Sequence, residues 1–204
     1  MKNTIIQNLL TKRFATKQFD ITKKVSEEDL QYILECARLS CSSLNIQPWL
    51  ITVVTNPEIR AKIGEASFGQ PQVTAASHLL VISAVKDEVS RAQLVANDIR
   101  SVAGDEAAQK YLQTVLGAGA RVTPEMKQAW LQKQTYLALQ AMILAAADRD
   151  IDSCPMEGFD SIKVAEILGQ TDAVPTTMLP IGYAAAPGRP KSRLLMDQIV
   201  KRVE

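Results

Sequence analysis

Cys41-Ser42-Ser43-Leu44-Asn45-Ile46-Gln47-Pro48-Trp49 is the stretch around which the rest of the chain is organised. It holds two hydroxyls, two side-chain amides and one indole, and it carries no charge. Hydroxyls and amides can donate or accept hydrogen bonds, which suits a neutral polar ligand such as a polyol chain or a planar heterocycle. The same residue types are common in ordinary loops, and Trp49 could simply begin a strand. This stretch alone therefore leaves a ligand site and a plain loop both open.

Regular structure is predicted on both sides of this stretch. Upstream, Ser26 is placed to cap a helix with an acidic first turn, and apolar residues follow from Leu30 to Ala37 at helical spacing. Downstream, residues 50–55 form an apolar strand, and Asn56-Pro57 begins another helix. A helix therefore leads into the polar stretch and a strand leads out of it.

The remaining elements follow from apolar periodicity and from helix start and stop signals. Pro180 cannot donate to a sheet ladder, so we expect an edge position or a bulge there. We expect helices at 3–10, 160–168 (ended by Gly169) and 124–147, one or two helices within 87–122, and strands at 79–85 and 176–186.

Composition limits the class of protein. A chain of 204 residues, 47% hydrophobic and 22% charged, fits one globular domain over residues 1–204. The net charge of +1 argues against nucleic acid or an anionic membrane as partner. Three unpaired cysteines, no signal peptide and no apolar run of membrane length make a cytoplasmic protein the expectation. The only histidine, His78, has no evident partners, so we expect a packing role and no metal site.

Three further stretches carry polar chemistry. Arg13-Phe14-Ala15-Thr16-Lys17 places two cations four residues apart, where they could bracket an anion or simply be solvated. Phe68-Gly69-Gln70-Pro71-Gln72 is uncharged, and its amides could serve a ligand or merely fill a turn. In Arg189-Pro190-Lys191-Ser192-Arg193, Lys191 and Arg193 would point the same way on an extended chain, as a phosphate grip requires.

Together these motifs resemble the nitroreductase family of FMN-dependent NAD(P)H oxidoreductases. The order Arg-x-x-x-Lys, Ser-Ser-x-Asn-x-Gln-Pro-Trp, Gln-Pro-Gln, Pro-Met-Glu-Gly-Phe and Lys-Ser-Arg is closest to the oxygen-insensitive nitroreductase and dihydropteridine reductase branch. The resemblance runs from Leu9 to Arg193. It implies an α+β fold, a three-layer α-β-α sandwich with a mixed, largely antiparallel sheet. It also implies a homodimer with two FMN at the interface, with helix 124–147 in that interface and the tail 187–204 embracing the partner subunit.

The resemblance also implies a role for each motif in binding FMN. Arg13, Lys191 and Arg193 would hold the phosphate, and Lys17 would lie near the N1/O2 edge of the flavin ring. Ser42, Ser43 and Asn45 would contact the ribityl chain and ring, partly from the other subunit. Gln70 and Gln72 would meet the pyrimidine edge. Within Pro155-Met156-Glu157-Gly158, the last two residues would offer backbone N–H groups to flavin N5 and O4.

Two departures from the closest branch concern the same site. Phe14-Ala15 stands where that branch has His-Ser; the flavin contact at Phe14 would be largely main-chain, and a hydroxyl is lost at Ala15. Gln72 stands where a lysine is common, which makes the flavin edge less positive.

The implied reaction moves a hydride from NADH or NADPH through flavin N5 to a nitroaromatic, quinone, pteridine or enal, by a ping-pong mechanism. No side chain need act as an all-or-none catalytic residue, and Phe68 and Tyr111 would line the acceptor slot. Two alternatives stay open at this point: a flavin-binding carrier or sensor without turnover, and a cofactor-free helical interaction protein.

Overall fold

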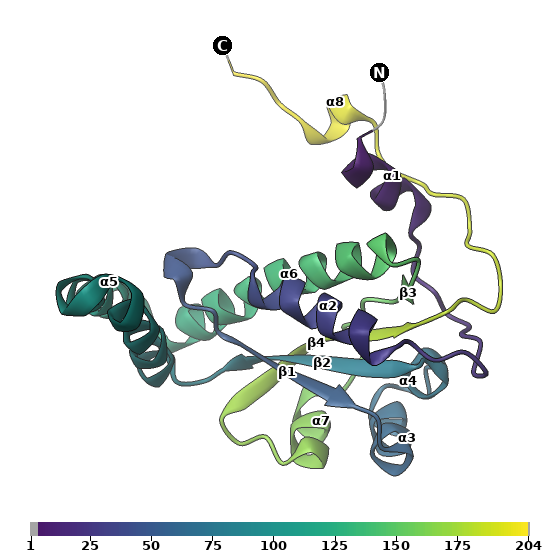
Figure 1. Cartoon of the computed structure of the whole chain (residues 1–204), viewed down its shortest axis with the longest axis horizontal. Helices are drawn as coiled ribbons and strands as arrows, with labels where there is room; N and C mark the ends of the chain where they lie inside the picture. The colour runs from purple at the N-terminus through teal and green to yellow at the C-terminus, as the bar shows by residue number, and fades with distance from the viewer. Residues whose placement is uncertain (1–3, 204) are drawn as a thin grey trace.

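A four-stranded sheet forms the centre of the computed structural model, which describes residues 4–203 (Figure 1). The strands are β1 (Trp49–Val54), β2 (His78–Val85), β3 (Asp152–Ser153) and β4 (Ala173–Gly182), in the order β1-β2-β4-β3. All neighbouring strands are antiparallel. One isolated parallel bridge, between Ala15 and Ser153, makes the arrangement mixed, as expected.

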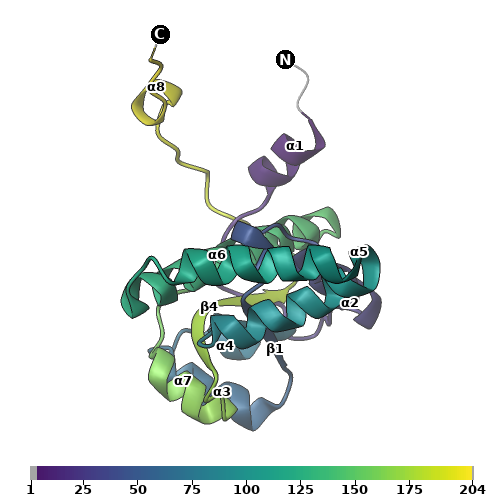
Figure 2. The same ribbon diagram turned by 90° about the vertical axis from the view of Figure 1, so that its left-hand side faces the viewer.

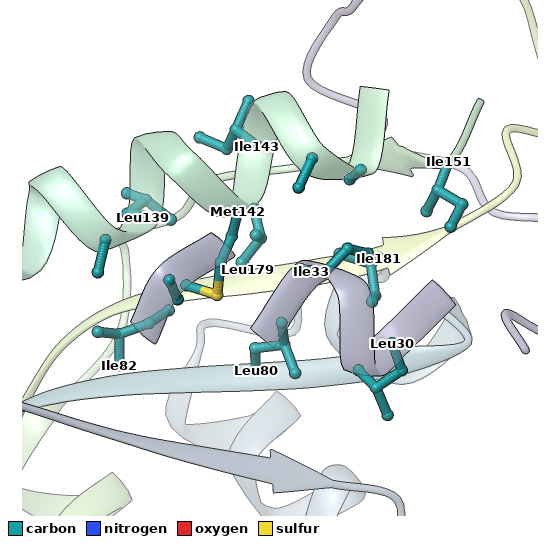
Figure 3. Close-up of a cluster of buried hydrophobic side chains, with 14 of the residues drawn as sticks. Leu30, Ile33, Leu80, Ile82, Leu139, Met142, Ile143, Ile151, Leu179 and Ile181 are labelled. Carbon is teal, nitrogen blue, oxygen red and sulfur yellow. The ribbon is translucent and has the colours of Figure 1, made fainter. Parts of the chain in front are cut away.

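Helices cover both faces of this sheet (Figures 1 and 2). On one face α2 (Glu27–Arg38) and α6 (Pro124–Asp148) pack on the strands, and their contact is a cluster that includes Ile33, Leu80, Met142 and Ile181 (Figure 3). On the other face lie α3 (Pro57–Ala66), α4 (Gln72–Ala75) and α7 (Ser161–Leu168). The expected α+β fold and three-layer sandwich are therefore confirmed.

Local sequence signals explain where the helices begin and end. Side-chain oxygens of Ser26, Asn56 and Asp160 accept hydrogen bonds from the first backbone N–H groups of α2, α3 and α7. Gly169 ends α7 at φ +64°, a left-handed conformation that glycine adopts without steric cost. The sequence predicts the caps at Ser26 and Asn56 and the stop at Gly169, whereas Asp160, expected as the first residue of its helix, is the cap.

The long helix α5 (Glu88–Gly119) is interrupted at Gly104, whose φ of +86° is non-helical. The helical structure predicted between residues 87 and 122 is therefore confirmed: Gly104 divides it into two consecutive helical segments. α6 is buried on several sides in its second half, from Ala138 to Ala147, and yet Tyr136 and Leu137 remain exposed. The sandwich thus does not cover all of the apolar surface of α6.

Two expectations need correction. Pro180 is neither at an edge nor in a bulge: it pairs with Leu79 inside β4, and its carbonyl accepts from the Cys154 N–H at 3.1 Å. Little is lost, because the Pro180 carbonyl points to the β3 side, where a backbone N–H of this residue would also point, and β3 already ends at Ser153. The register shift of this strand pair lies instead at Ile82/Ser83. The loop expected at 68–73 also ends in a helix, since α4 begins at Gln72.

The chain ends project from the sandwich as α1 (Ile5–Lys12) and α8 (Met196–Ile199) (Figure 2). The helix expected at 3–10 begins at Ile5; Asn3 lies outside the described residues. No helix in residues 4–203 is long and apolar enough to cross a membrane. Large apolar side chains are exposed at both ends: Ile5, Ile6, Leu10, Leu194, Leu195, Met196, Ile199, Val200 and Val203.

Candidate functional site

A cleft of about 1070 Å³ lies between residues 11–18 and residues 186–193. The isolated bridge of Ala15 to Ser153 fixes the first segment to the sheet edge, and the second segment continues from β4. Six cationic residues line the cleft and no acidic residue does: Lys12, Arg13, Lys17, Arg189, Lys191 and Arg193. Among these lining residues only Lys12 is neutralised by a nearby acid, since it pairs with Asp150.

Arg13 is the clearest sign of a ligand in this cleft. Its Nε and Nη2 atoms are buried and have no hydrogen-bond partner within residues 4–203. Burial, and then the charge of Arg193, lower the pKa of Arg13; burial, Arg13 and Arg193 likewise lower that of Lys191. The Lys191 ammonium donates to the Arg13 carbonyl at 2.5 Å. Since unpaired buried donors and clustered like charges are costly, the arrangement calls for an anion with several oxygens, such as a phosphate.

Phe14 holds the two sides of the cleft together. A side-chain carbon added to Gly188 would lie 2.4 Å from the Phe14 ring, so the tail backbone rests directly on that ring. Because a side chain at position 188 would fit only if the ring moved, the phenyl group is packed directly against the tail. Phe14, which stands where the most similar branch has histidine, therefore packs the tail against residues 11–18 at this site.

Lys17 connects the cleft to the segment after β3. The Thr16 N–H donates to the Ser153 carbonyl at 3.2 Å, and the Lys17 ammonium lies 3.3 Å from the Cys154 sulfur. Met156, two residues further on, exchanges backbone hydrogen bonds of 2.9 Å with Met178 of β4. The structure thus places Pro155-Met156-Glu157-Gly158 beside the cationic cleft, on a backbone fixed by β4.

Glu157 and Gly158 present unused backbone donors. Within the described residues neither N–H has a hydrogen-bond partner, whereas the next one, of Phe159, donates to the Glu157 carbonyl at 2.9 Å. The Glu157 side chain lies near Tyr136 of α6; burial and this carboxylate raise the pKa of Tyr136 to about 12. The free N–H groups are suited to an acceptor atom of a ligand at this turn.

Gln70 and Gln72 belong to the same surface. The Gln70 amide nitrogen donates to the Gly158 carbonyl at 2.8 Å, and the Gln72 amide nitrogen donates to the Gln70 oxygen at 2.9 Å. Phe68, at φ +57° and 77% exposed, stands at the turn before them. The fold therefore brings together the segments 13–17, 70–72, 155–158 and 191–193.

The stretch at 41–49 is strained. Leu44, Asn45 and Gln47 have φ values of +54°, +53° and +46°, in a region that residues other than glycine rarely adopt. Ser42–Gln47 nevertheless has fixed contacts: the Ser42 hydroxyl accepts from the Gln47 N–H at 2.9 Å, and Gln134 of α6 accepts from the Ser43 N–H at 2.8 Å. Strain held in place by such contacts is typical of binding sites.

This strained stretch lies away from the cationic cleft. η1 (Ser43–Asn45) follows the C-terminal end of α2, whereas the two segments that line the cleft, 11–18 and 186–193, lie beyond the N-terminal end of α2 (Figure 1). The 12 residues of α2 alone span roughly 18 Å. Tyr111 lies with the stretch, its hydroxyl 3.5 Å from the Asn45 carbonyl, and Phe68 lies with the other group. The chain thus holds these candidate site residues in two separate groups and does not bring Phe68 and Tyr111 together.

Sequence reasoning missed several residues that shape these two groups. The sequence pattern assigned no site role to Gln134 or Cys154, but they contact Ser43 and Lys17. Arg60 is buried and donates to the carbonyls of Val73, Ala76 and Ser77 behind Gln72. An amide on a largely apolar helix face was the available signal for Gln134, whereas Arg60 lies among Glu58, Lys62 and Glu65 and gave no such signal.

Comparison with known proteins gives consistent matches. The model of the Nitroreductase family matches residues 10–183. A protein of Staphylococcus saprophyticus, named as a candidate NAD(P)H nitroreductase, is 36% identical over 223 residues, covering 100% of this chain and 99% of that protein. The structure of a candidate NAD(P)H:FMN oxidoreductase of Staphylococcus epidermidis has a TM-score of 0.89 at 24% identity, covering 100% of this chain and 97% of the other. A candidate nitroreductase of Exiguobacterium sibiricum was solved in complex with FMN. Its structure has a TM-score of 0.88 at 24% identity, covering 100% of this chain and 99% of the other.

Proposed function

The chain belongs to the nitroreductase family, and on this premise we propose that it is an FMN-dependent oxidoreductase that uses NADH or NADPH. The observation that carries this proposal is Arg13, which has two buried, unpartnered nitrogens and lines a cleft that contains six cations and no acid. A phosphate would supply the missing acceptors, and FMN is the ligand of a protein with the same fold.

The residues in and beside the cleft fit the two ends of FMN, its phosphate and its ring. Arg13, Lys191 and Arg193 would hold the phosphate, and Ala15 and Phe14 would border it with backbone and ring. The free N–H groups of Glu157 and Gly158 would face the reactive edge of the flavin, within the turn that Pro155 and Met156 begin. Lys17 would stabilise negative charge on the ring edge, since a nearby cation favours the reduced, anionic form.

When bound, FMN would supply the group that accepts a hydride from NAD(P)H and passes it to a planar acceptor. The side chains of this chain bind and orient the reactants, and solvent can supply the protons that a nitroaromatic, quinone, pteridine or enal needs. We therefore assign no side chain as a catalytic acid or base. A carrier or sensor on the same fold would bind FMN but would not turn over.

Steady-state kinetics separate an enzyme from a carrier. With NADH or NADPH varied at several fixed quinone concentrations, the double-reciprocal plots should be parallel, as expected when the donor product leaves before the acceptor binds. Reduction by NAD(P)H without reoxidation by any quinone, nitroaromatic, pteridine or enal would support the carrier. Intersecting lines would contradict the ping-pong order.

We further propose that the complete site forms between two copies of the chain. Its support is the separation of the two groups, with Ser42, Ser43, Asn45 and Tyr111 in one and the cationic cleft in the other. The apolar side chains left exposed on α6, on α1 and on the tail 187–204 supply a surface for the partner subunit. In such a dimer the tail would embrace the partner, and Phe68 of one copy would meet Tyr111 of the other.

Subunit complementation tests this arrangement. One variant carries Arg13→Met and Arg193→Ala, the other Ser43→Pro and Asn45→Ala, and each alone should bind FMN weakly at both sites. In a mixed dimer one site receives all four changes and the other receives none. Co-expressed, differently tagged chains should therefore regain one tight FMN site per dimer; mixed dimers without any tight site would refute a shared site.

A further inference from the structure

We propose that Gln72 is a positioning residue that acts through Gln70, and that the pair fixes the Gln70 amide as a hydrogen-bond donor to the bound flavin. This assignment rests on the proposed function, because it concerns the same cofactor site. It changes the role expected for Gln72 from the sequence, where both glutamines would contact the pyrimidine edge directly.

The Gly158 carbonyl determines the orientation of both amides. A carbonyl oxygen can only accept, so the Gln70 atom at 2.8 Å from it must be the nitrogen. The Gln70 oxygen is then turned toward Gln72, whose nearest atom, at 2.9 Å, must in turn be its nitrogen. One fixed acceptor thus removes the usual ambiguity between the oxygen and nitrogen of a side-chain amide.

Burial assigns different positions to the two glutamines. Gln72 is 1% exposed and begins α4, whereas Gln70 is only half-buried at the surface. Behind them, Arg60 donates to the Val73 and Ala76 carbonyls at 2.9 and 2.6 Å and so fixes the position of α4. Gln72 therefore stands on a rigid base and supports Gln70 from within.

Gln70 also lies very close to the segment that carries the free N–H groups. A side-chain carbon built on Gly158 would be only 3.0 Å from the Gln70 nitrogen. The two bonds thus join Gln72, Gln70 and the Gly158 peptide into one chain, next to the unpartnered N–H groups of Glu157 and Gly158.

The unused N–H of the Gln70 amide defines which further hydrogen bond this residue can make. Its nitrogen has a second N–H beyond the one given to Gly158, so it can donate once more to a carbonyl oxygen of the flavin. Such an oxygen gains negative charge on reduction, which makes that hydrogen bond stronger in the reduced state. The pair should therefore favour reduced over oxidised FMN without placing any charge at the ring edge.

The test compares the affinities for oxidised and reduced FMN in a double-mutant cycle. Gln72→Met removes the donor to Gln70 at similar length, and Gln70→Met removes the donor to the flavin. Each variant should lower the affinity for reduced FMN by about two- to ten-fold relative to the affinity for oxidised FMN, as the loss of one hydrogen bond predicts. The double variant should resemble Gln70→Met alone, because Gln72 acts only through Gln70.

Gln170→Met is the matched control. Gln170 accepts from the Ser83 hydroxyl and donates to the Thr52 hydroxyl, both at 2.8 Å, in a polar pair of the same kind that contains no residue of the cleft. This variant should lose stability and leave the two FMN affinities in their wild-type ratio. Additive effects of Gln70→Met and Gln72→Met, or a wild-type ratio in Gln72→Met, would overturn the proposal. Failure of wild type to bind FMN would instead refute the proposed function.

Discussion

Arg13→Met should weaken FMN binding by about ten- to a hundred-fold, the loss expected from charge-assisted hydrogen bonds to the phosphate. Riboflavin, which has no phosphate, should bind the variant and wild type almost equally. The FMN-free variant should also unfold with a free energy about 1–3 kcal/mol higher, since two buried donors without partners are removed. Flavin titrations and urea denaturation of the apo-protein measure these opposite effects.

Lys12→Met provides the control for this prediction. Lys12 lines the same cleft next to Arg13, but its ammonium is exposed and pairs with Asp150. We expect FMN affinity and stability close to wild type, because an exposed ion pair contributes little. An Arg13→Met variant that loses riboflavin as strongly as FMN would show that Arg13 supports the fold and does not bind the phosphate.

Arg60→Met should destabilise the protein strongly, by roughly 3 kcal/mol or more, because the carbonyls of Val73, Ala76 and Ser77 lose their buried donor. The pKa of Arg60 is lowered by burial alone, and no acid within residues 4–203 pairs with it, so these carbonyls are its partners. Urea denaturation with and without FMN is the measurement. FMN affinity should fall as well, since α4 carries Gln72.

Arg60→Lys and Lys62→Met separate this effect from a general loss of charge on α3. A lysine at 60 can reach one or two of the carbonyls and should give an intermediate loss. Lys62 is exposed on the same helix, and its replacement should be nearly neutral. Wild-type stability in Arg60→Met would mean that water or a shifted helix satisfies the three carbonyls.

Short-range signals predicted the fold well. The caps Ser26 and Asn56 and the stop at Gly169 depend on atoms a few residues apart, so sequence spacing contains the necessary information. The same holds for the cationic pattern at 189–193, where alternation on an extended chain placed Lys191 and Arg193 in one cleft.

Long-range contacts explain what sequence reasoning did not predict. Gln134 accepts from a residue 91 positions earlier, and Gln70 donates to one 88 positions later. Neither pairing has a periodic pattern that would reveal it. Pro180 was wrongly predicted to lie at an edge or bulge. The sequence did not reveal that β3, a strand of two residues after α6, pairs with β4 and makes β4 an inner strand. The FMN roles of the site residues remain predictions that the variants above address.

The visible absorption spectrum of the purified protein tests the central claim most directly. We expect a yellow protein that releases FMN, and not FAD, on denaturation, with its colour bleached anaerobically by NADH or NADPH and restored by a quinone. A colourless protein that takes up no FMN when it is added would contradict the account. In that case the stretch at 41–49 would be a plain loop and the cationic cleft would serve another anion.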